Sequence, residues 1–185
     1  MNGRVTLRGT TIVTLIVAAA LSRLLPHPPN FTPVGALALF AGTYLADKRL
    51  AFVIPLAALA LSDAILGFHL LLPLVYGCFA LTVCLGFGLR KRVQLAGLAT
   101  RVLAASVLFF VVTNFGVWEL GTMYPHSIPG LISCYVAAIP FFRNTLLGDA
   151  SFTALLFGSF AFAERVIPAL RESAEVGSPA TSVHE

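Results

Sequence analysis

The sequence predicts an all-α integral membrane protein built as one bundle of six transmembrane helices, and three observations lead to this prediction. Of the 185 residues, 58% are hydrophobic and only 11% are charged, with a mean hydropathy of +0.90. Soluble domains carry about 25% charged residues, so the composition excludes an ordinary soluble domain. Apolar runs of helical length recur along the chain, and the charges lie in short clusters between them. Clusters of this kind are typical topology signals, which makes the lipid bilayer, and not nucleic acid, the expected partner of the net charge of +4.

The predicted spans follow in chain order. The first covers Leu7–Leu25; a cleaved signal peptide is the alternative, but we expect a retained helix because the apolar character continues to Leu25 and further apolar spans follow. The second span, Pro33–Ala46, is short for a bilayer core of about 30 Å, so the connector before it is expected to supply the missing depth. The remaining spans are Leu50–Leu66, Leu70–Leu89, Leu95–Phe115 and Leu146–Ile167.

One more apolar patch, Ile128–Phe142, contains Pro140 and is too short to span comfortably. We predict that it forms an extra interfacial or re-entrant helix in the last outward loop. The length of the chain suits a single transmembrane domain over residues 1–172. The polar segment 173–185 is predicted to be a disordered cytoplasmic tail.

The basic residues predict the orientation of the bundle. With six spans, one side receives ten of them: Arg4, Arg8, Lys48, Arg49, Arg90, Lys91, Arg92, Arg101, Arg165 and Arg171. The other side receives only Arg23 and Arg143. Because cytoplasmic loops carry the excess of Lys and Arg, both termini are expected to be cytoplasmic.

The three outward connections, 23–32, 62–69 and 113–149, hold nearly all the polar and aromatic residues that could carry chemistry. The first contains four prolines between Pro26 and Pro33, which forbid a continuous helix. A kinked polar connector cannot lie bare in lipid and must lie at the surface or line an enclosed cavity. We therefore predict an outward-facing pocket roofed by this connector.

The expected ligand contacts combine amides, aromatic rings and charges. Asn114, Trp118, Glu119 and Tyr124 lie within eleven residues and suit a flat organic ligand with polar edges, although an aromatic belt at the membrane interface is the alternative. The full set of predicted substrate contacts is Asn30, Asp63, Asn114, Trp118, Glu119, Tyr124, Tyr135, Arg143 and Asn144.

Two charged residues of this set have structural alternatives. Asp63 is either a ligand or cation contact, or a helix-end carboxylate paired with Arg23 or Arg143. Arg143 could anchor a carboxylate or phosphate, or pair with Asp149 or Glu119.

The start of the last span also has a structural interpretation. Asn144 and Thr145 are plausible N-cap residues for that span. Asp149 is expected in its first turns, where a negative charge complements the helix dipole.

Several motifs are absent from the sequence. It has no Walker A loop, no HExxH, no G-x-S-x-G and no Cys–His metal spacing. Cys78, Cys84 and Cys134 lie in apolar segments and are expected to be small buried residues. The sequence therefore predicts no enzyme activity, no cofactor, no metal and no ATP hydrolysis of its own.

The run from Ser22 to Phe40, SRLLPHPPNFTPVGALALF, resembles the hallmark of an uncharacterised bacterial family of candidate membrane transport proteins. Shorter runs at 62–63, 113–118, 124–125, 134–135 and 140–149 fit the same family. This resemblance covers roughly Leu21–Gly158 and implies a multi-pass protein of the bacterial cytoplasmic (inner) membrane.

That family in turn resembles the substrate-binding S components of energy-coupling-factor vitamin transporters in size, in six spans with both ends inside, and in its outward cap of loops. The resemblance implies an S-component fold that captures a vitamin from outside and works with a transmembrane coupling subunit and cytoplasmic ATPases. It also implies partner docking through Thr14, Ala18 and Ser22 on the first span, although the usual pair is alanines. Internal bundle packing is the alternative for these small residues.

The leading functional hypothesis is a membrane transport subunit that captures a small organic micronutrient at its outer face for ATPase-coupled uptake. A stand-alone permease or channel for an unknown small solute is the second. An intramembrane enzyme using Asp63, Glu119 and His126 is the third, and no nucleophile–base spacing supports it.

Overall fold

The computed structural model describes the backbone of residues 2–171 and the side chains of residues 7–171, so the predicted tail lies outside the described residues. The described part is all-α, as predicted. It consists of α1 (Asn2–Ser22), α2 (Val34–Tyr44), α3 (Lys48–Leu66), α4 (Leu72–Phe87), α5 (Leu95–Leu120), α6 (Ile128–Val166) and a 3-10 helix, η1 (Pro168–Leu170). Among these, α3, α5 and α6 are long and apolar enough to cross a membrane, which suggests a multi-pass membrane protein.

The short helix α2 lies at the centre of the bundle. Nine of its eleven residues are buried, and it packs against α1, α3, α4 and α6. A helix that is apolar on all sides must be buried, either among other elements or in a membrane, and α2 is buried among its neighbours. Phe40 is fully buried and meets Phe157 and Phe160 of α6 edge-on, with ring centroids 5.3 and 5.7 Å apart.

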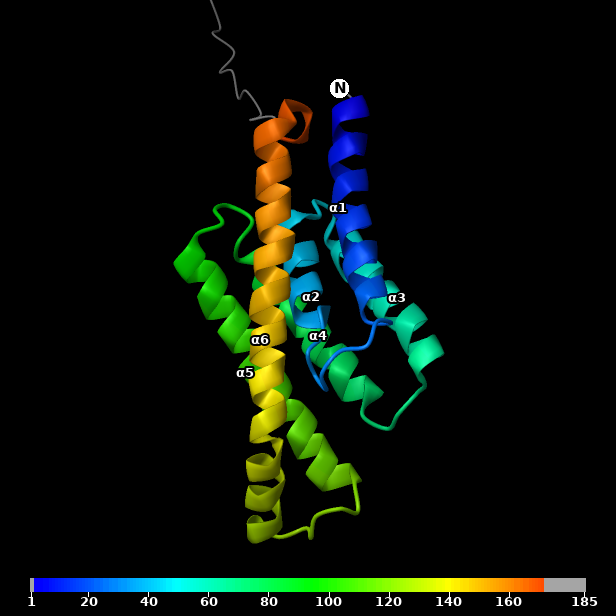
Figure 1. The fold of residues 1–185 in the computed structure, drawn as a ribbon, viewed down its shortest axis with the longest axis vertical. Helices are drawn as coiled ribbons and strands as arrows, with labels where there is room; N and C mark the ends of the chain where they lie inside the picture. The colour runs from blue at the N-terminus through cyan, green and yellow to red at the C-terminus, as the bar shows by residue number, and fades with distance from the viewer. Residues whose placement is uncertain (1, 172–185) are drawn as a thin grey trace, which may run out of the picture.

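The connections between helices alternate between two ends of the bundle (Figure 1). The start of α1, the α2–α3 and α4–α5 connections and the end of α6 lie toward one end, at the top of the view. The connector 23–33 and the loops 67–71 and 121–127 lie toward the other. The basic α2–α3 and α4–α5 connections therefore lie toward the same end as the last turn of α6, which contains Arg165.

Two arginines of the basic end bond to helix C-termini. Arg90 donates to the carbonyl oxygens of Gly42 at 2.9 Å and Leu45 at 2.6 Å, where α2 ends. Arg101 donates to the carbonyl oxygen of Leu85 at 3.1 Å, in the last turn of α4. Carbonyl groups at a helix C-terminus lack partners within the helix, so a guanidinium group satisfies them and complements the helix dipole.

The structure contradicts one predicted element. The predicted interfacial helix at Ile128–Phe142 is not separate, because α6 runs without a break from Ile128 to Val166. Ser127 is the N-cap of α6, and its side chain accepts a hydrogen bond from the Gly130 N–H at 3.3 Å. The prediction that Asn144 and Thr145 cap the last span is therefore also wrong, since both lie inside α6.

The reason for this difference is that packing overrides the helix-breaking tendency of Pro140. A proline removes one intrahelical hydrogen bond, but α6 contacts α5 on both sides of Pro140, through Tyr135 before it and through Phe142 and Asp149 after it. The last outward connection accordingly shrinks to residues 121–127. A 39-residue helix is about 58 Å long, well beyond a bilayer core of about 30 Å.

Candidate functional site

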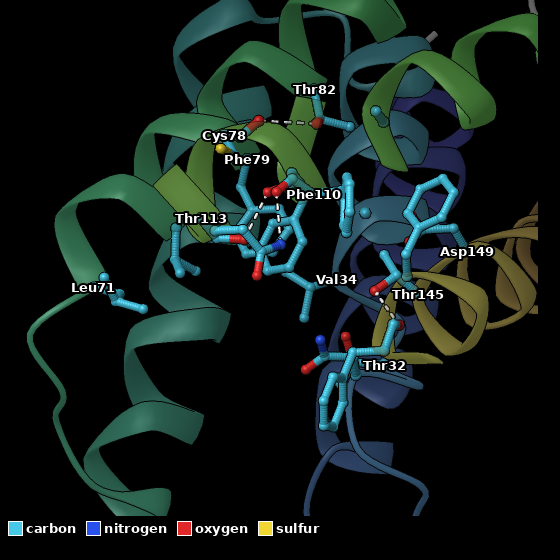
Figure 2. A pocket seen from close by; sticks show the side chains of 18 of the residues that line it. Thr32, Val34, Leu71, Cys78, Phe79, Thr82, Phe110, Thr113, Thr145 and Asp149 are labelled. Atoms are coloured by element: carbon cyan, nitrogen blue, oxygen red, sulfur yellow. Dashed lines mark hydrogen bonds between the residues drawn. The ribbon is translucent and has the colours of Figure 1, made fainter. Parts of the chain in front are cut away.

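A cavity of about 330 Å³ lies where the connector 23–33 meets the first turns of α2 and α4, the C-terminal half of α5 and the middle of α6. Figure 2 shows its walls, with Thr145 and Asp149 on one side and Leu71 and Thr113 on the other. Small-molecule pockets commonly occupy about 300–1,000 Å³ and are mostly apolar with a few placed polar groups. The size and lining of this cavity match that description.

One part of the lining is aromatic. Phe79 of α4 stacks on Phe109 of α5, with ring centroids 5.7 Å apart and an interplanar angle of 23°. Phe110 of α5 packs against Phe142 of α6 at 4.8 Å, and Phe141 completes the set. Rings of this kind offer flat apolar faces to a ligand.

A second part of the lining carries short polar side chains. Thr82, Thr113 and Thr145 each donate a hydroxyl hydrogen bond to the carbonyl oxygen four residues earlier, at 2.9, 2.7 and 3.1 Å. The Asn114 amide donates to the Phe110 carbonyl oxygen at 2.7 Å. These bonds use donors, so the hydroxyl oxygens and the Asn114 carbonyl oxygen keep acceptor capacity for a ligand.

Asp149 is the buried carboxylate of the cavity, with 6% of its surface exposed. Its Oδ2 accepts a hydrogen bond from the Ser106 hydroxyl at 2.7 Å, and the carboxylate also accepts from the Ala36 backbone N–H. A Cβ on Gly35 would lie 2.3 Å from Asp149 Oδ1, so any larger residue at position 35 would force the carboxylate to move.

The position of Asp149 corrects its predicted role. The residue lies near the middle of α6 and not in the first turns of a helix that starts near it. It nevertheless meets a helix N-terminus, because Ala36 belongs to the first turn of α2, where Pro33 provides no side-chain cap. The Asp149 carboxylate, which belongs to α6, thus accepts a hydrogen bond from a backbone N–H in the first turn of α2.

The mouth of the cavity holds an ion pair. Arg23, which lines the cavity, pairs with Asp63 Oδ1 at 2.9 Å and also donates to the Ser62 hydroxyl. The Tyr76 hydroxyl donates to Asp63 Oδ2 at 3.0 Å. The structural alternative for Asp63, pairing with Arg23, is therefore confirmed, and Asp63 itself does not line the cavity.

The proline-rich connector packs on α6. The Asn144 amide donates to the Pro29 carbonyl oxygen at 3.0 Å, and a Cβ on Gly148 would lie 3.0 Å from the Thr32 nitrogen. Asn30 has a positive φ of 63°, a conformation that asparagine tolerates better than most residues, and lines the cavity beside Thr32. Asn144 thus positions the roof and does not line the cavity itself.

Of the nine predicted substrate contacts, the structure places Asn30 and Asn114 in the lining of the cavity. Trp118 donates to the Pro125 carbonyl oxygen at 2.9 Å, and the Tyr135 hydroxyl donates to the Val111 carbonyl oxygen at 2.7 Å. The predicted contacts outside the lining are Asp63, Trp118, Glu119, Tyr124, Tyr135, Arg143 and Asn144.

The cavity also contains residues that we did not predict. Phe79, Phe109, Thr82 and Thr113 lie within apolar spans, where nothing in a single sequence separates a cavity-facing phenylalanine from a lipid-facing one. Threonines inside otherwise apolar helices were the available signal. The part of the chain that the structure describes contains no group of three or more residues suited to hold a metal ion.

The predicted docking residues lie on the outer side of α1. Thr14 and Ala18 are exposed and border a shallow apolar groove with Val13 and Val17. Ser22 is not part of this groove, and its hydroxyl donates to the Ala19 carbonyl oxygen at 2.7 Å.

Comparison with known proteins gives one match. The sequence profile of a group described as "Family of unknown function (DUF6580)" matches residues 4–170, which is nearly the whole chain. The searches of curated proteins and of solved structures gave no match.

Proposed function

The chain belongs to the DUF6580 family of unknown function, and from this premise we propose that it is a membrane transport subunit that captures a small organic micronutrient in its cavity. The observation that carries the proposal is the cavity itself, about 330 Å³ with an aromatic wall and a few acceptor groups. The bundle would sit in the membrane with all six helices embedded and both termini in the cytoplasm, like an S component.

The placement of the cavity supports capture from outside. Its lining includes Arg23, Asn30, His69 and Leu71, all from connections at the end of the bundle opposite the basic loops. By the positive-inside rule, the basic end faces the cytoplasm, so this mouth faces outward. A solute arriving from outside would therefore meet the connector and the α3–α4 loop first.

Thr14 and Ala18 favour a subunit over a stand-alone permease. They leave small exposed side chains on α1, where a helix of a coupling subunit could approach closely. Translocation would then draw on ATPases of the partner complex, since the sequence has no Walker A loop.

A thermal-shift screen of the purified protein against water-soluble vitamins and their precursors tests the proposal. We expect one compound class to raise the melting temperature, and calorimetry to give one ligand per chain, because binding to the folded state alone stabilises it. No stabilisation across the whole screen would contradict micronutrient capture. Uptake of the bound compound in cells that lack coupling ATPases would support the permease instead.

A further inference from the structure

Asp149 is a buried carboxylate that forms no ion pair with any side chain that the structure describes. The ion pairs formed among the described side chains are Arg8–Glu164 and Arg23–Asp63, and neither includes Asp149. Carboxylates inside a membrane domain are costly and normally pair with a positive group or mark a functional site. Since Asp149 is 6% exposed and lines the cavity, a positive group of a bound ligand would find its carboxylate there.

Burial opposes a charge on Asp149, and the hydrogen bonds to its carboxylate offset only part of that cost. Both groups that bond to it, the Ser106 hydroxyl and the Ala36 N–H, are donors. The N-terminus of α2 adds a partial charge of roughly +0.5. A carboxylate has about four acceptor positions, so further positions remain for a ligand.

The remaining charged group of the lining does not cancel this negative charge. Arg23 is held by Asp63 at 2.9 Å, and that pair is neutral as a unit. Phe79, Phe109 and Phe110 also line the cavity, and the π-faces of aromatic rings attract organic cations. A carboxylate combined with aromatic rings is the chemistry that recognises ammonium and related nitrogen cations.

We propose that the ligand of this cavity is a small organic cation, whose positive nitrogen lies against the Asp149 carboxylate and whose body packs on the phenylalanine rings. This inference rests on the proposed function and narrows its substrate class.

Two sets of matched probes test the charge preference. Choline, 3,3-dimethylbutanol and 3,3-dimethylbutyrate share a shape and differ in charge, as do benzylammonium, benzyl alcohol and benzoate. We expect each cation to bind the purified wild-type protein at least tenfold more tightly than its neutral analogue, with the anion weakest. Equal affinity of cation and neutral analogue, or no binding by any of the six, would overturn the inference.

Asp149→Asn assigns the preference to this residue. The variant keeps the side-chain size, and we expect the cation and neutral affinities to fall within about twofold of each other. Asp47→Asn is the matched control, because Asp47 caps α3 at the basic end and asparagine also caps helices; its preference should equal that of wild type. An Asp149→Asn protein that keeps the full preference would overturn the assignment.

Two further arms separate this inference from other outcomes. If sodium or potassium stabilises the wild-type protein but not Asp149→Asn, and the organic cations stabilise neither, the proposal that the ligand is an organic cation is overturned. If the Asp149→Asn protein is not monodisperse, the affinities of the six probes for the wild-type protein still test whether the cavity prefers cations. A neutral or anionic micronutrient that binds the cavity would refute this inference and leave the proposed function standing.

Discussion

At the residue scale, glycines set the close contact between two helices of this bundle. A Cβ on Gly42 of α2 would lie 2.2 Å from the Val83 carbonyl oxygen, and one on Gly86 of α4 would lie 2.5 Å from the Leu39 carbonyl oxygen. The backbones of α2 and α4 thus touch, which small residues permit between membrane helices. The contact fixes α2, whose first turn brings Gly35 into the lining of the cavity.

Gly42→Ala should destabilise the protein by about 1–3 kcal/mol, because the added methyl group meets backbone that cannot move aside. Thermal or denaturant unfolding in detergent measures the change. Gly77→Ala, on the same pair of elements but with nothing within 4 Å of the added Cβ, is the control and should be neutral or slightly stabilising. Equal effects of the two substitutions would contradict the close contact.

At this scale the sequence predicted only part of the cavity. Asn30 and Asn114, which were among the predicted substrate contacts, do line the cavity. Trp118 and Tyr135 were also predicted, but they bond to backbone carbonyls outside the cavity. Asp149 was predicted as a structural residue, and its place in the lining depends on which helices pack together, which a single sequence does not contain.

At the scale of elements, α6 differs most from prediction. The predicted bounds of the other five helices lie close to the observed ones, because each helix is a single apolar run between polar or helix-breaking residues. In α6, Pro140, Arg143 and Asn144 have the residue types expected at the end of a helix, yet the helix continues through them. A short polar stretch in the sequence can mark either a break between two helices or a polar patch on one long helix. Tertiary packing decides which of the two forms.

A distance measurement tests the continuity of α6. Spin labels at Val136 and Leu155, both exposed, should give one narrow distribution at a distance somewhat above about 28 Å, the axial rise of nineteen residues at about 1.5 Å each. Labels at Leu103 and Leu120 of α5 provide a control within a helix without proline. A markedly shorter or bimodal Val136–Leu155 distance would restore the separate interfacial helix.

At the scale of the whole molecule, the account depends on the two ends of the bundle facing opposite compartments. The basic loops lie at one end and the connections that roof the cavity lie toward the other (Figure 1). This arrangement was predictable, because charge clusters alternate with spans whether or not the details of α6 are right.

Cysteine labelling tests this sidedness in a background without native cysteines. His27→Cys and Met123→Cys should react with a membrane-impermeant maleimide from outside, since both positions are exposed in connections at the cavity end. Lys91→Cys, in the α4–α5 connection, should react only after permeabilisation. Labelling of Met123→Cys and Lys91→Cys from the same side would contradict the proposed orientation.

The most direct test of ligand capture is calorimetric titration of one neighbouring pair of alanine variants with the compound that the screen identifies. Ala138 is buried and lines the cavity, whereas Ala137 is exposed on the same turn of α6. We predict that Ala138→Phe fills the cavity and weakens binding at least tenfold, while Ala137→Phe binds one ligand per chain as wild type does. Wild-type binding by a folded Ala138→Phe protein would contradict the account.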